Sequence, residues 1–183
     1  MSKKGRAITY IDGFNLYNGM MDSGLGNYRW INYLHATKLV LGNMIRIYYG
    51  RFQLFPSECN ICQTSPLYCA NCGAEYKKPN EKKTDVNIAT SMLVDCFEDN
   101  TDAIILVSGD SDYTAPLDEI GRLFPNIERI ITFPPSRKNG KLYNHCDQHF
   151  SITSSHFAGA GLLPQSVTNP RTGTVFAIPS SWK

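Results

Sequence analysis

The chain has 183 residues, of which 42% are hydrophobic and 19% are charged, a composition typical of a soluble globular protein. Its formal net charge of +2 is too small to indicate nucleic-acid binding by itself, so any affinity for a polyanion must come from local basic patches. The apolar run near the N-terminus ends at Asp12 after a few residues, which argues against a signal peptide or a membrane span. We therefore expect a cytoplasmic protein with one domain and no membrane partner.

The opening of the chain predicts a β-α-β unit. A first strand is expected at residues 7–11, and it ends at Asp12. Asn15 follows, either as a helix N-cap or as an amide ligand beside that carboxylate. Residues 31–41 have the spacing of an amphipathic helix, and residues 44–49 predict a second strand, so the crossover is expected to be right-handed.

Residues 50–80 interrupt this alternation, and they hold four of the six cysteines in two C-x-x-C pairs. The paired cysteines are Cys59, Cys62, Cys69 and Cys72. In a chain without an export signal such pairs favour metal ligation over disulfides, and four thiolates fill the tetrahedral shell of one structural Zn²⁺. We expect a zinc knuckle inserted at residues 51–80, with free or redox-active thiols as the alternative. The other two cysteines, Cys96 and Cys146, are interpreted as core or incidental residues.

A run of lysines leads directly into a segment whose apolar residues recur at helical spacing from 86 to 97. The lysines are Lys77, Lys78, Lys82 and Lys83. Thr84 suits the N-cap of this helix, which puts Asp85 in the first turn, where the helix dipole favours a carboxylate. Dipole compensation alone would explain Asp85. Three acidic residues at the end of the helix are interpreted as solvated surface: Asp95, Glu98 and Asp99.

The segment from residue 103 to residue 117 joins a strand to a helix through a short polar loop. The continuous apolar run at 103–107 predicts a strand buried on both faces. Asp110 and Asp112 follow at its carboxyl end, which is where open α/β sheets place their ligands. Crowded carboxylates repel, and Mg²⁺ or Mn²⁺ between them would relieve the repulsion because hard cations prefer oxygen ligands. The alternative is that both residues only cap the next helix.

The rest of the chain predicts a helix at 115–124 and strands at 127–133 and 150–153. The loop after residue 133 carries a basic cluster of Arg137, Lys138 and Lys141. The tail, residues 154–183, is rich in Gly, Pro, Ser and Thr and is expected to form an extended arm that packs on the body.

Three segments, YIDGFNLY (10–17), EKKTDV (81–86) and LVSGDSDYTAPL (106–117), occur in the order and spacing that resemble the NYN domain family of PIN-like nucleases. The resemblance implies a Rossmann-like three-layer α/β/α fold, in which we expect a parallel sheet of about five strands in the order 2-1-3-4-5. It also implies a divalent-metal-dependent ribonuclease. The expected organisation is a nuclease domain at residues 1–153, which contains the zinc-knuckle insert, followed by the C-terminal arm at 154–183.

The family's functional residues can be carried onto this sequence position by position. Its metal carboxylates match Asp12, Asp85, Asp110 and Asp112, and Asn15 and Ser108 match supporting polar groups, with Ser108 also a candidate for substrate contact. Lys82 lies where many relatives place a lysine three residues before the helix aspartate. Lys83 stands where the family commonly has glycine, so either lysine is a candidate for contact with substrate.

The resemblance and the acidic residues together predict an endoribonuclease that hydrolyses RNA to 5′-phosphate and 3′-hydroxyl ends with Mg²⁺ or Mn²⁺. Basic side chains would hold the phosphates of a single-stranded RNA: Arg51, Lys77, Lys78, Lys82, Lys83, Arg137, Lys138 and Lys141. One rival function is a non-catalytic module that binds RNA or a protein. The other is a small-molecule phosphatase, against which the absence of a D-x-D pattern at Asp12 counts. Whether a second copy or another protein binds is left open.

Overall fold

The computed structural model describes residues 5–28, 44–48, 51–160, 166–168 and 175–177. The helix expected at residues 31–41 lies outside these ranges. In the described part of the chain, none of the helices combines the length and the apolarity that crossing a bilayer requires.

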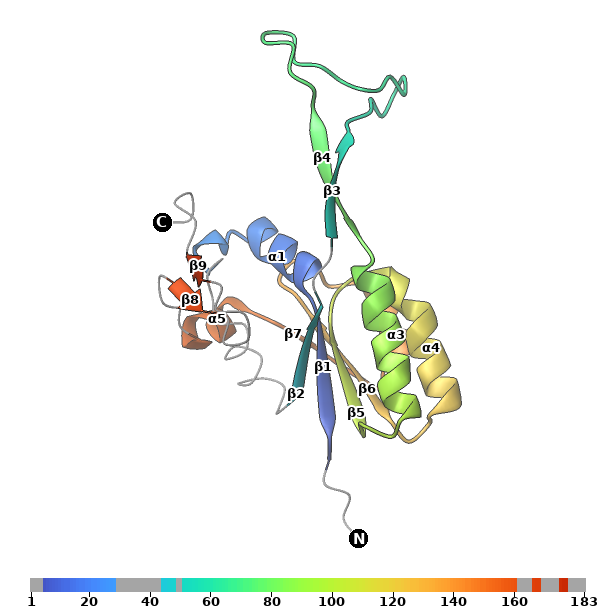
Figure 1. The fold of residues 1–183 in the computed structure, drawn as a ribbon. Helices are drawn as coiled ribbons and strands as arrows, with labels where there is room; N and C mark the ends of the chain where they lie inside the picture. Colours follow the sequence, from blue (N-terminus) through green and yellow to red (C-terminus); the bar gives the residue numbers. More distant parts are fainter. Residues whose placement is uncertain (1–4, 29–43, 49–50, 161–165, 169–174, 178–183) are drawn as a thin grey trace.

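A five-stranded parallel sheet forms the centre of the fold (Figure 1). Its strands are β1 (Ala7–Asp12), β2 (Met44–Tyr48), β5 (Ala103–Val107), β6 (Glu128–Phe133) and β7 (Gln148–Ser151). They are ordered β2-β1-β5-β6-β7, and every neighbouring pair is parallel. The expectation of an α/β fold built on a parallel sheet is confirmed.

Helices cover both faces of this sheet (Figure 1). On one face lie α3 (Thr84–Phe97) and α4 (Thr114–Leu123), whose apolar side chains share one core cluster with alternate residues of the central strands. On the other face lie α1 (Gly13–Asp22) and α5 (Ser154–Ala160), which contribute to a second cluster. Among the described residues are also the short 3₁₀ turns η1 (Gly26–Tyr28), η2 (Ser111–Tyr113) and η3 (Gly140–His145).

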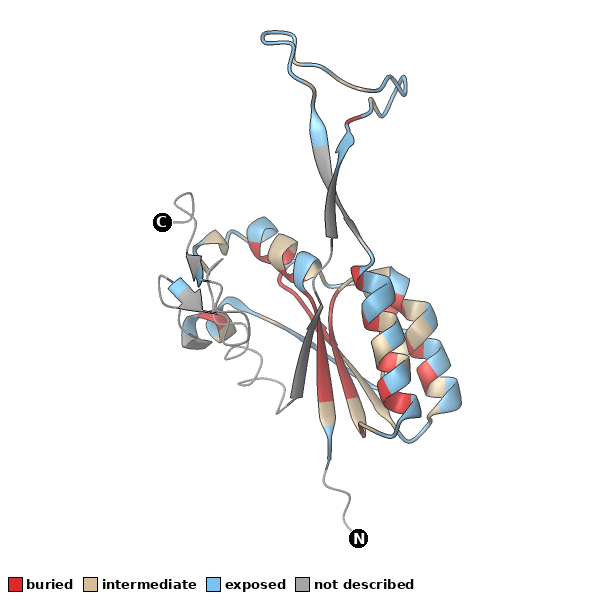
Figure 2. Ribbon diagram, in the orientation of Figure 1, coloured by how far each residue is buried: buried red, intermediate tan, exposed pale blue. Residues whose placement is uncertain are grey.

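The two cores explain the continuous apolar run of β5. Ile104 and Leu106 pack in the cluster beneath α3 and α4, whereas Ile105 and Val107 pack in the cluster beneath α1 and α5. Because successive side chains of a strand point to opposite faces, a strand with helices on both sides needs an apolar residue at every position. Figure 2 shows the resulting buried stripe along the central strands.

Two small antiparallel units lie outside the sheet. β3 (Arg51–Pro56) and β4 (Lys77–Lys82) form a hairpin, here called the arm (residues 51–82), which projects away from the body and leads through Lys83 into α3 (Figure 1). In the C-terminal tail, for which we expected an extended arm, α5 is followed by the paired strands β8 (Ser166–Thr168) and β9 (Val175–Ala177).

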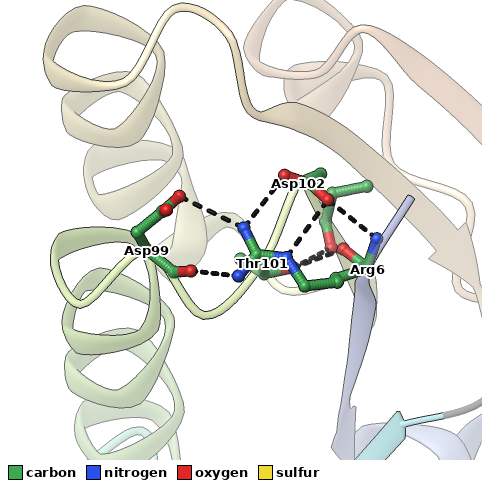
Figure 3. A network of polar contacts seen from close by, with 5 residues as sticks. Arg6, Asp99, Thr101 and Asp102 are labelled. Atoms are coloured by element: carbon green, nitrogen blue, oxygen red, sulfur yellow. Dashed lines mark hydrogen bonds and ion pairs between the residues drawn. The ribbon is translucent and has the colours of Figure 1, made fainter. Parts of the chain in front are cut away.

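Arg6 fastens the start of β1 to the residues that precede β5 (Figure 3). Its backbone N–H donates to the Asp102 carboxylate at 2.9 Å, and its Nη2 donates to the same carboxylate at 3.1 Å. Its carbonyl accepts from the Asp102 N–H at 2.7 Å and from the Thr101 hydroxyl at 3.0 Å. These bonds join the amino ends of the two central strands in the register that puts Ile11 beside Val107.

The expectation that Asp95 lies on the solvated surface is wrong, because its side chain is only 1% exposed. Its carboxylate accepts a hydrogen bond of 2.6 Å from the Tyr10 hydroxyl of β1 and another of 3.2 Å from the Asn100 amide. A buried carboxylate is tolerated where such donors replace its lost hydration. The interpretation of Cys96 and Cys146 as core residues is correct, since Cys96 is buried in the core beneath α3 and Cys146 packs against it.

We expect Tyr10→Phe to lower the free energy of unfolding by about 1–3 kcal/mol, because the buried Asp95 carboxylate loses a donor that no water can replace. Urea denaturation followed by circular dichroism measures this difference. The matched control is Tyr68→Phe, which removes the same hydroxyl from a side chain that is 61% exposed and should change stability by less than about 0.5 kcal/mol. Equal unfolding midpoints for Tyr10→Phe and the unmodified protein would contradict the proposed strength of this buried pair.

Candidate metal centre and active site

The carboxyl ends of β1 and β5 bring Asp12 and Ser108 together at one edge of the sheet. The register of the two strands places Ile11 beside Val107, so the next residues, Asp12 and Ser108, are neighbours. The Ser108 hydroxyl donates to Asp12 Oδ2 at 2.9 Å and accepts from the Asp110 N–H at 3.1 Å. Ser108 is completely buried, which excludes direct contact with a substrate in this conformation and gives it a positioning role instead.

The Asn15 side chain connects α1 to the loop after β5. Its Oδ1 accepts from the Gly109 N–H at 3.0 Å, while its own backbone N–H donates to Asp12 Oδ1 at 2.9 Å. Asp12 is therefore the N-cap of α1, and the interpretation of Asn15 as that cap is wrong. This amide therefore holds the first turn of α1, which Asp12 caps, against the loop that carries Asp110 and Asp112.

Three carboxylates converge in front of these loops. One oxygen from each of Asp85, Asp110 and Asp112 lies within 4.8 Å of the others. Asp85 comes from the first turn of α3, while Asp110 caps η2 through a 3.0 Å bond from the Asp112 N–H. Three negative charges at this separation repel unless a cation lies between them, and carboxylate oxygens are the ligands that Mg²⁺ and Mn²⁺ prefer. We call these three residues the acidic cluster; Asp12 is buried and is not one of the three.

Tyr113 positions Asp85, a role that the sequence did not reveal. Its hydroxyl donates to Asp85 Oδ1 at 3.0 Å, and its side chain is only 1% exposed. Burial raises the pKa of the Tyr113 hydroxyl above its usual value, and the charges of Asp12 and Asp85 raise it further. The phenol therefore stays neutral and keeps its donor. The position of Tyr113 directly after Asp112 places it beside the candidate site in the sequence. Its hydrogen-bond partner, Asp85, lies 28 residues away, so the sequence could not show the contact.

The loop after β6 packs tightly against the acidic loop. The Asn139 amide donates to the Gly109 carbonyl at 2.9 Å, and a Cβ added at Gly109 would lie 1.9 Å from the Arg137 carbonyl oxygen. The Arg137 guanidinium forms an ion pair with Asp22 at the end of α1. This bond, donated by Arg137 Nη2, holds the loop against the end of α1.

The candidate phosphate-binding side chains differ in their surroundings. Lys83, Lys138 and Lys141 are exposed, and Lys138 lies over the Tyr143 ring with its Nζ 5.7 Å from the ring centroid. Lys77 forms a 3.2 Å ion pair with Glu75 on the arm. The remaining candidate side chains lie outside the described residues: Arg51, Lys78 and Lys82.

The four arm cysteines form two turns with the same backbone hydrogen bonds. The Cys59 N–H donates to the Thr64 carbonyl and the Gln63 N–H to the Cys59 carbonyl, at 3.0 and 2.9 Å. The second turn repeats this pattern ten residues later, from Cys69 to Ala74 and from Gly73 to Cys69, at 2.8 and 2.9 Å. The fifth residue of each turn, Gln63 or Gly73, has a positive φ, of 58° or 69°.

The thiols of these turns interact in pairs. The Thr64 hydroxyl, 3.1 Å from Cys62 Sγ, lowers the pKa of that thiol to about 7, and the backbone N–H groups of Cys72 and Asn71 lower the pKa of Cys69 to about 7. No three cysteine sulfurs within the described ranges lie within 4.8 Å of one another. The structure therefore has two cysteine pairs and does not by itself support a closed four-cysteine zinc site.

Comparison with known proteins identifies the family. The family model of the NYN domain matches residues 6–153, which include both central strands and the whole acidic cluster. The chain belongs to the NYN domain family. This NYN domain therefore has the fold of the PIN-like nucleases.

The fold of the NYN domain is also found in a solved structure, a protein of unknown function from Vibrio parahaemolyticus. The two are 16% identical in sequence, with a TM-score of 0.52 over 84% of this chain and 97% of that chain, so the likeness concerns the fold alone. A search of curated proteins found no match.

We expect Gly109→Ala to lower the free energy of unfolding of the NYN domain by about 1–3 kcal/mol, because the new methyl group would overlap the Arg137 carbonyl and force two loops apart. Differential scanning calorimetry measures the change. Gly140→Ala is the matched control, since nothing lies within 4 Å of a Cβ at that position. Equal destabilisation by the two substitutions would show that the close approach at Gly109 does not constrain the loop.

Proposed function

We propose that this NYN domain is a divalent-metal-dependent endoribonuclease that hydrolyses RNA phosphodiesters to 5′-phosphate and 3′-hydroxyl ends. The observation that carries the proposal is the convergence of Asp85, Asp110 and Asp112 within 4.8 Å at the carboxyl edge of the sheet of an NYN fold. A cytoplasmic location would suit this activity, because its substrate would be cellular RNA.

The donor set suits Mg²⁺ or Mn²⁺. Asp85, Asp110 and Asp112 would hold the ion, and Asp12 would add a fourth negative charge from the buried side. When bound, the ion activates a water molecule and neutralises charge that develops on the phosphate. The protein's own contribution is to keep the carboxylates in place: Tyr113 orients Asp85 through its hydroxyl, and Ser108 holds the Asp110 N–H and Asp12 at fixed positions.

The RNA phosphates on either side of the acidic cluster would meet basic side chains. Lys83 is exposed at the start of α3, two residues before Asp85, and Lys138 and Lys141 are exposed on the loop that packs against Gly109. We propose that these three lysines, together with Lys82, bind flanking phosphates of single-stranded RNA. Arg137 would act mainly by holding the loop through Asp22.

The test is Asp110→Asn, which removes one charge from the acidic cluster with little change in shape. We expect Mn²⁺-dependent cleavage of single-stranded RNA to fall by about 100-fold or more, because the ion loses a ligand that stabilises the transition state. Isothermal titration should show weaker Mn²⁺ binding, while RNA binding in EDTA should be retained. The matched control, Asp99→Asn, makes the same charge change at a side chain that is 85% exposed, and it should cleave normally.

Two outcomes would replace this proposal. If the intact protein binds RNA and does not cleave it with Mn²⁺, the domain is a binding module. If it hydrolyses a generic phosphomonoester such as p-nitrophenyl phosphate and leaves RNA intact, it is a phosphatase.

We also propose that the four arm cysteines bind one structural Zn²⁺. The support is the repeated turn geometry and a closed set of backbone bonds that ties the two turns together at their bases. In this set Ser57 donates to Tyr76, Tyr76 to Leu67, and Leu67 to Ser57, at 2.8, 2.8 and 3.0 Å. Turns of matching shape that share a base can present their thiolates to one tetrahedral ion, and four thiolates would leave it no open position for catalysis.

Protein purified without chelator should contain one zinc ion per chain, measured by inductively coupled plasma mass spectrometry. The double variant Cys62→Ser/Cys69→Ser should contain no zinc, because two of the four ligands are lost. Cys146→Ser, outside the arm, should retain the zinc. Mn²⁺ binding by the acidic cluster should be unchanged in all three proteins. A metal-free preparation in which every arm thiol reacts at once with a thiol reagent would contradict the zinc proposal.

A further inference from the structure

A shallow groove runs between α3 and α4, starting at the acidic cluster. Its volume is about 440 Å³, within the range of small-molecule sites, and two of its lining residues are Asp85 and Asp112. The two helices lie side by side along its length (Figure 1). Any ligand atom held by the acidic cluster therefore has this groove directly beside it.

Most of the groove wall is apolar. From α3 come Val86, Ala89 and Leu93, and from α4 come Ala115 and Pro116. Val86 is 69% exposed, which is unusual for a β-branched side chain in the first turn of a core helix. Such a wall suits a flat, weakly polar group and offers no hydrogen bonds along its apolar length.

The charges at the groove exclude a second phosphate. Besides Asp85 and Asp112, its lining contains Glu119 and no lysine or arginine. Glu119 forms an ion pair with Arg122 at 2.6 Å, on the exposed surface of α4. An anionic group would be repelled by the carboxylates, so of the parts of an RNA substrate the base suits this groove and a phosphate does not.

We propose that this groove binds the nucleobase adjacent to the scissile phosphate. The inference rests on the proposed function for the identity of the phosphodiester, since a nucleotide whose phosphate lies at the acidic cluster has its base as the neutral, flat group within reach of the groove. Both bonds from Arg122 go to Glu119 Oε2, so Glu119 Oε1 would be the acceptor for an exocyclic amino or ring N–H group of that base and Glu119 would help to determine specificity.

The experiment uses the methyl groups of Val86, Ala89 and Leu93 as reporters in NMR titrations of the full chain with Mg²⁺. Cytidine 5′-monophosphate and adenosine 5′-monophosphate should shift these methyl signals, whereas ribose 5-phosphate, which has the same phosphate and no base, should not. Ala89→Trp fills the groove and should abolish the shifts. Thr90→Trp places the same side chain on the exposed surface of α3 one residue away and should leave them intact.

In cleavage assays we compare an intact RNA with an RNA that has one abasic residue beside the cut position. The abasic RNA should have a kcat/KM at least about fivefold lower than the intact RNA with the unmodified protein and with Thr90→Trp. With Ala89→Trp the two RNAs should have the same kcat/KM, because the groove is already filled. Equal methyl shifts with ribose 5-phosphate, or no shifts with either nucleotide, would overturn the groove proposal. Base-dependent shifts in a protein that cleaves no RNA would sustain the groove and overturn the nuclease.

Discussion

The parallel pairing of β1 with β5 is the constraint on which the rest of the structure depends. These strands are more than ninety residues apart in sequence, and their register is set at one end by Arg6 with Asp102 and closed at the other by Ser108 with Asp12. A slip of one residue would exchange the two core faces of β5 and separate the acidic loops. The candidate site therefore depends on two adjacent buried strands that end in polar residues at the same level.

The three carboxylates of the acidic cluster repel one another, and the surrounding fold must offset this repulsion. Hydrogen bonds offset part of it: within the cluster, Asp85 accepts from Tyr113 and Asp110 accepts from the Asp112 N–H. The buried Asp12, outside the cluster, accepts from the Ser108 hydroxyl and the Asn15 N–H. Each donor is itself fixed by the backbone of a strand, a helix end or a 3₁₀ turn. Rigid supports of this kind favour a bound cation because little reorganisation is left for the moment of binding.

Local patterns in the sequence were sufficient to predict strands and helices whose apolar residues recur with a regular period. The apolar run 103–107 predicted a central strand, the spacing from 86 to 97 predicted a helix, and the position after a strand pointed to Asp110 and Asp112. Asp85, the third carboxylate of the cluster, was predicted only from the resemblance to the NYN family. Contacts between distant residues were beyond such patterns. Asp95 was predicted to lie on the surface because its hydrogen-bond partner, Tyr10, is 85 residues away in the sequence. Asn15 was interpreted as a helix cap because the residue that donates to its side chain, Gly109, is 94 residues away. Charge alone likewise could not show that Arg137 pairs with Asp22.

The arm reverses its charge along its length. Between residues 57 and 76 it has Glu58 and Glu75 and no lysine or arginine. Lys77 and Lys78 follow at the end of β4 that adjoins this distal part, whereas Lys82 and Lys83 stand at the root of the hairpin, before Asp85. The tip also exposes Ile61, at 95%, and Tyr68, at 61%. Positive charge is therefore carried by the strands of the arm and is absent between residues 57 and 76, so a polyanion would be attracted to the strands of the arm and not to its tip.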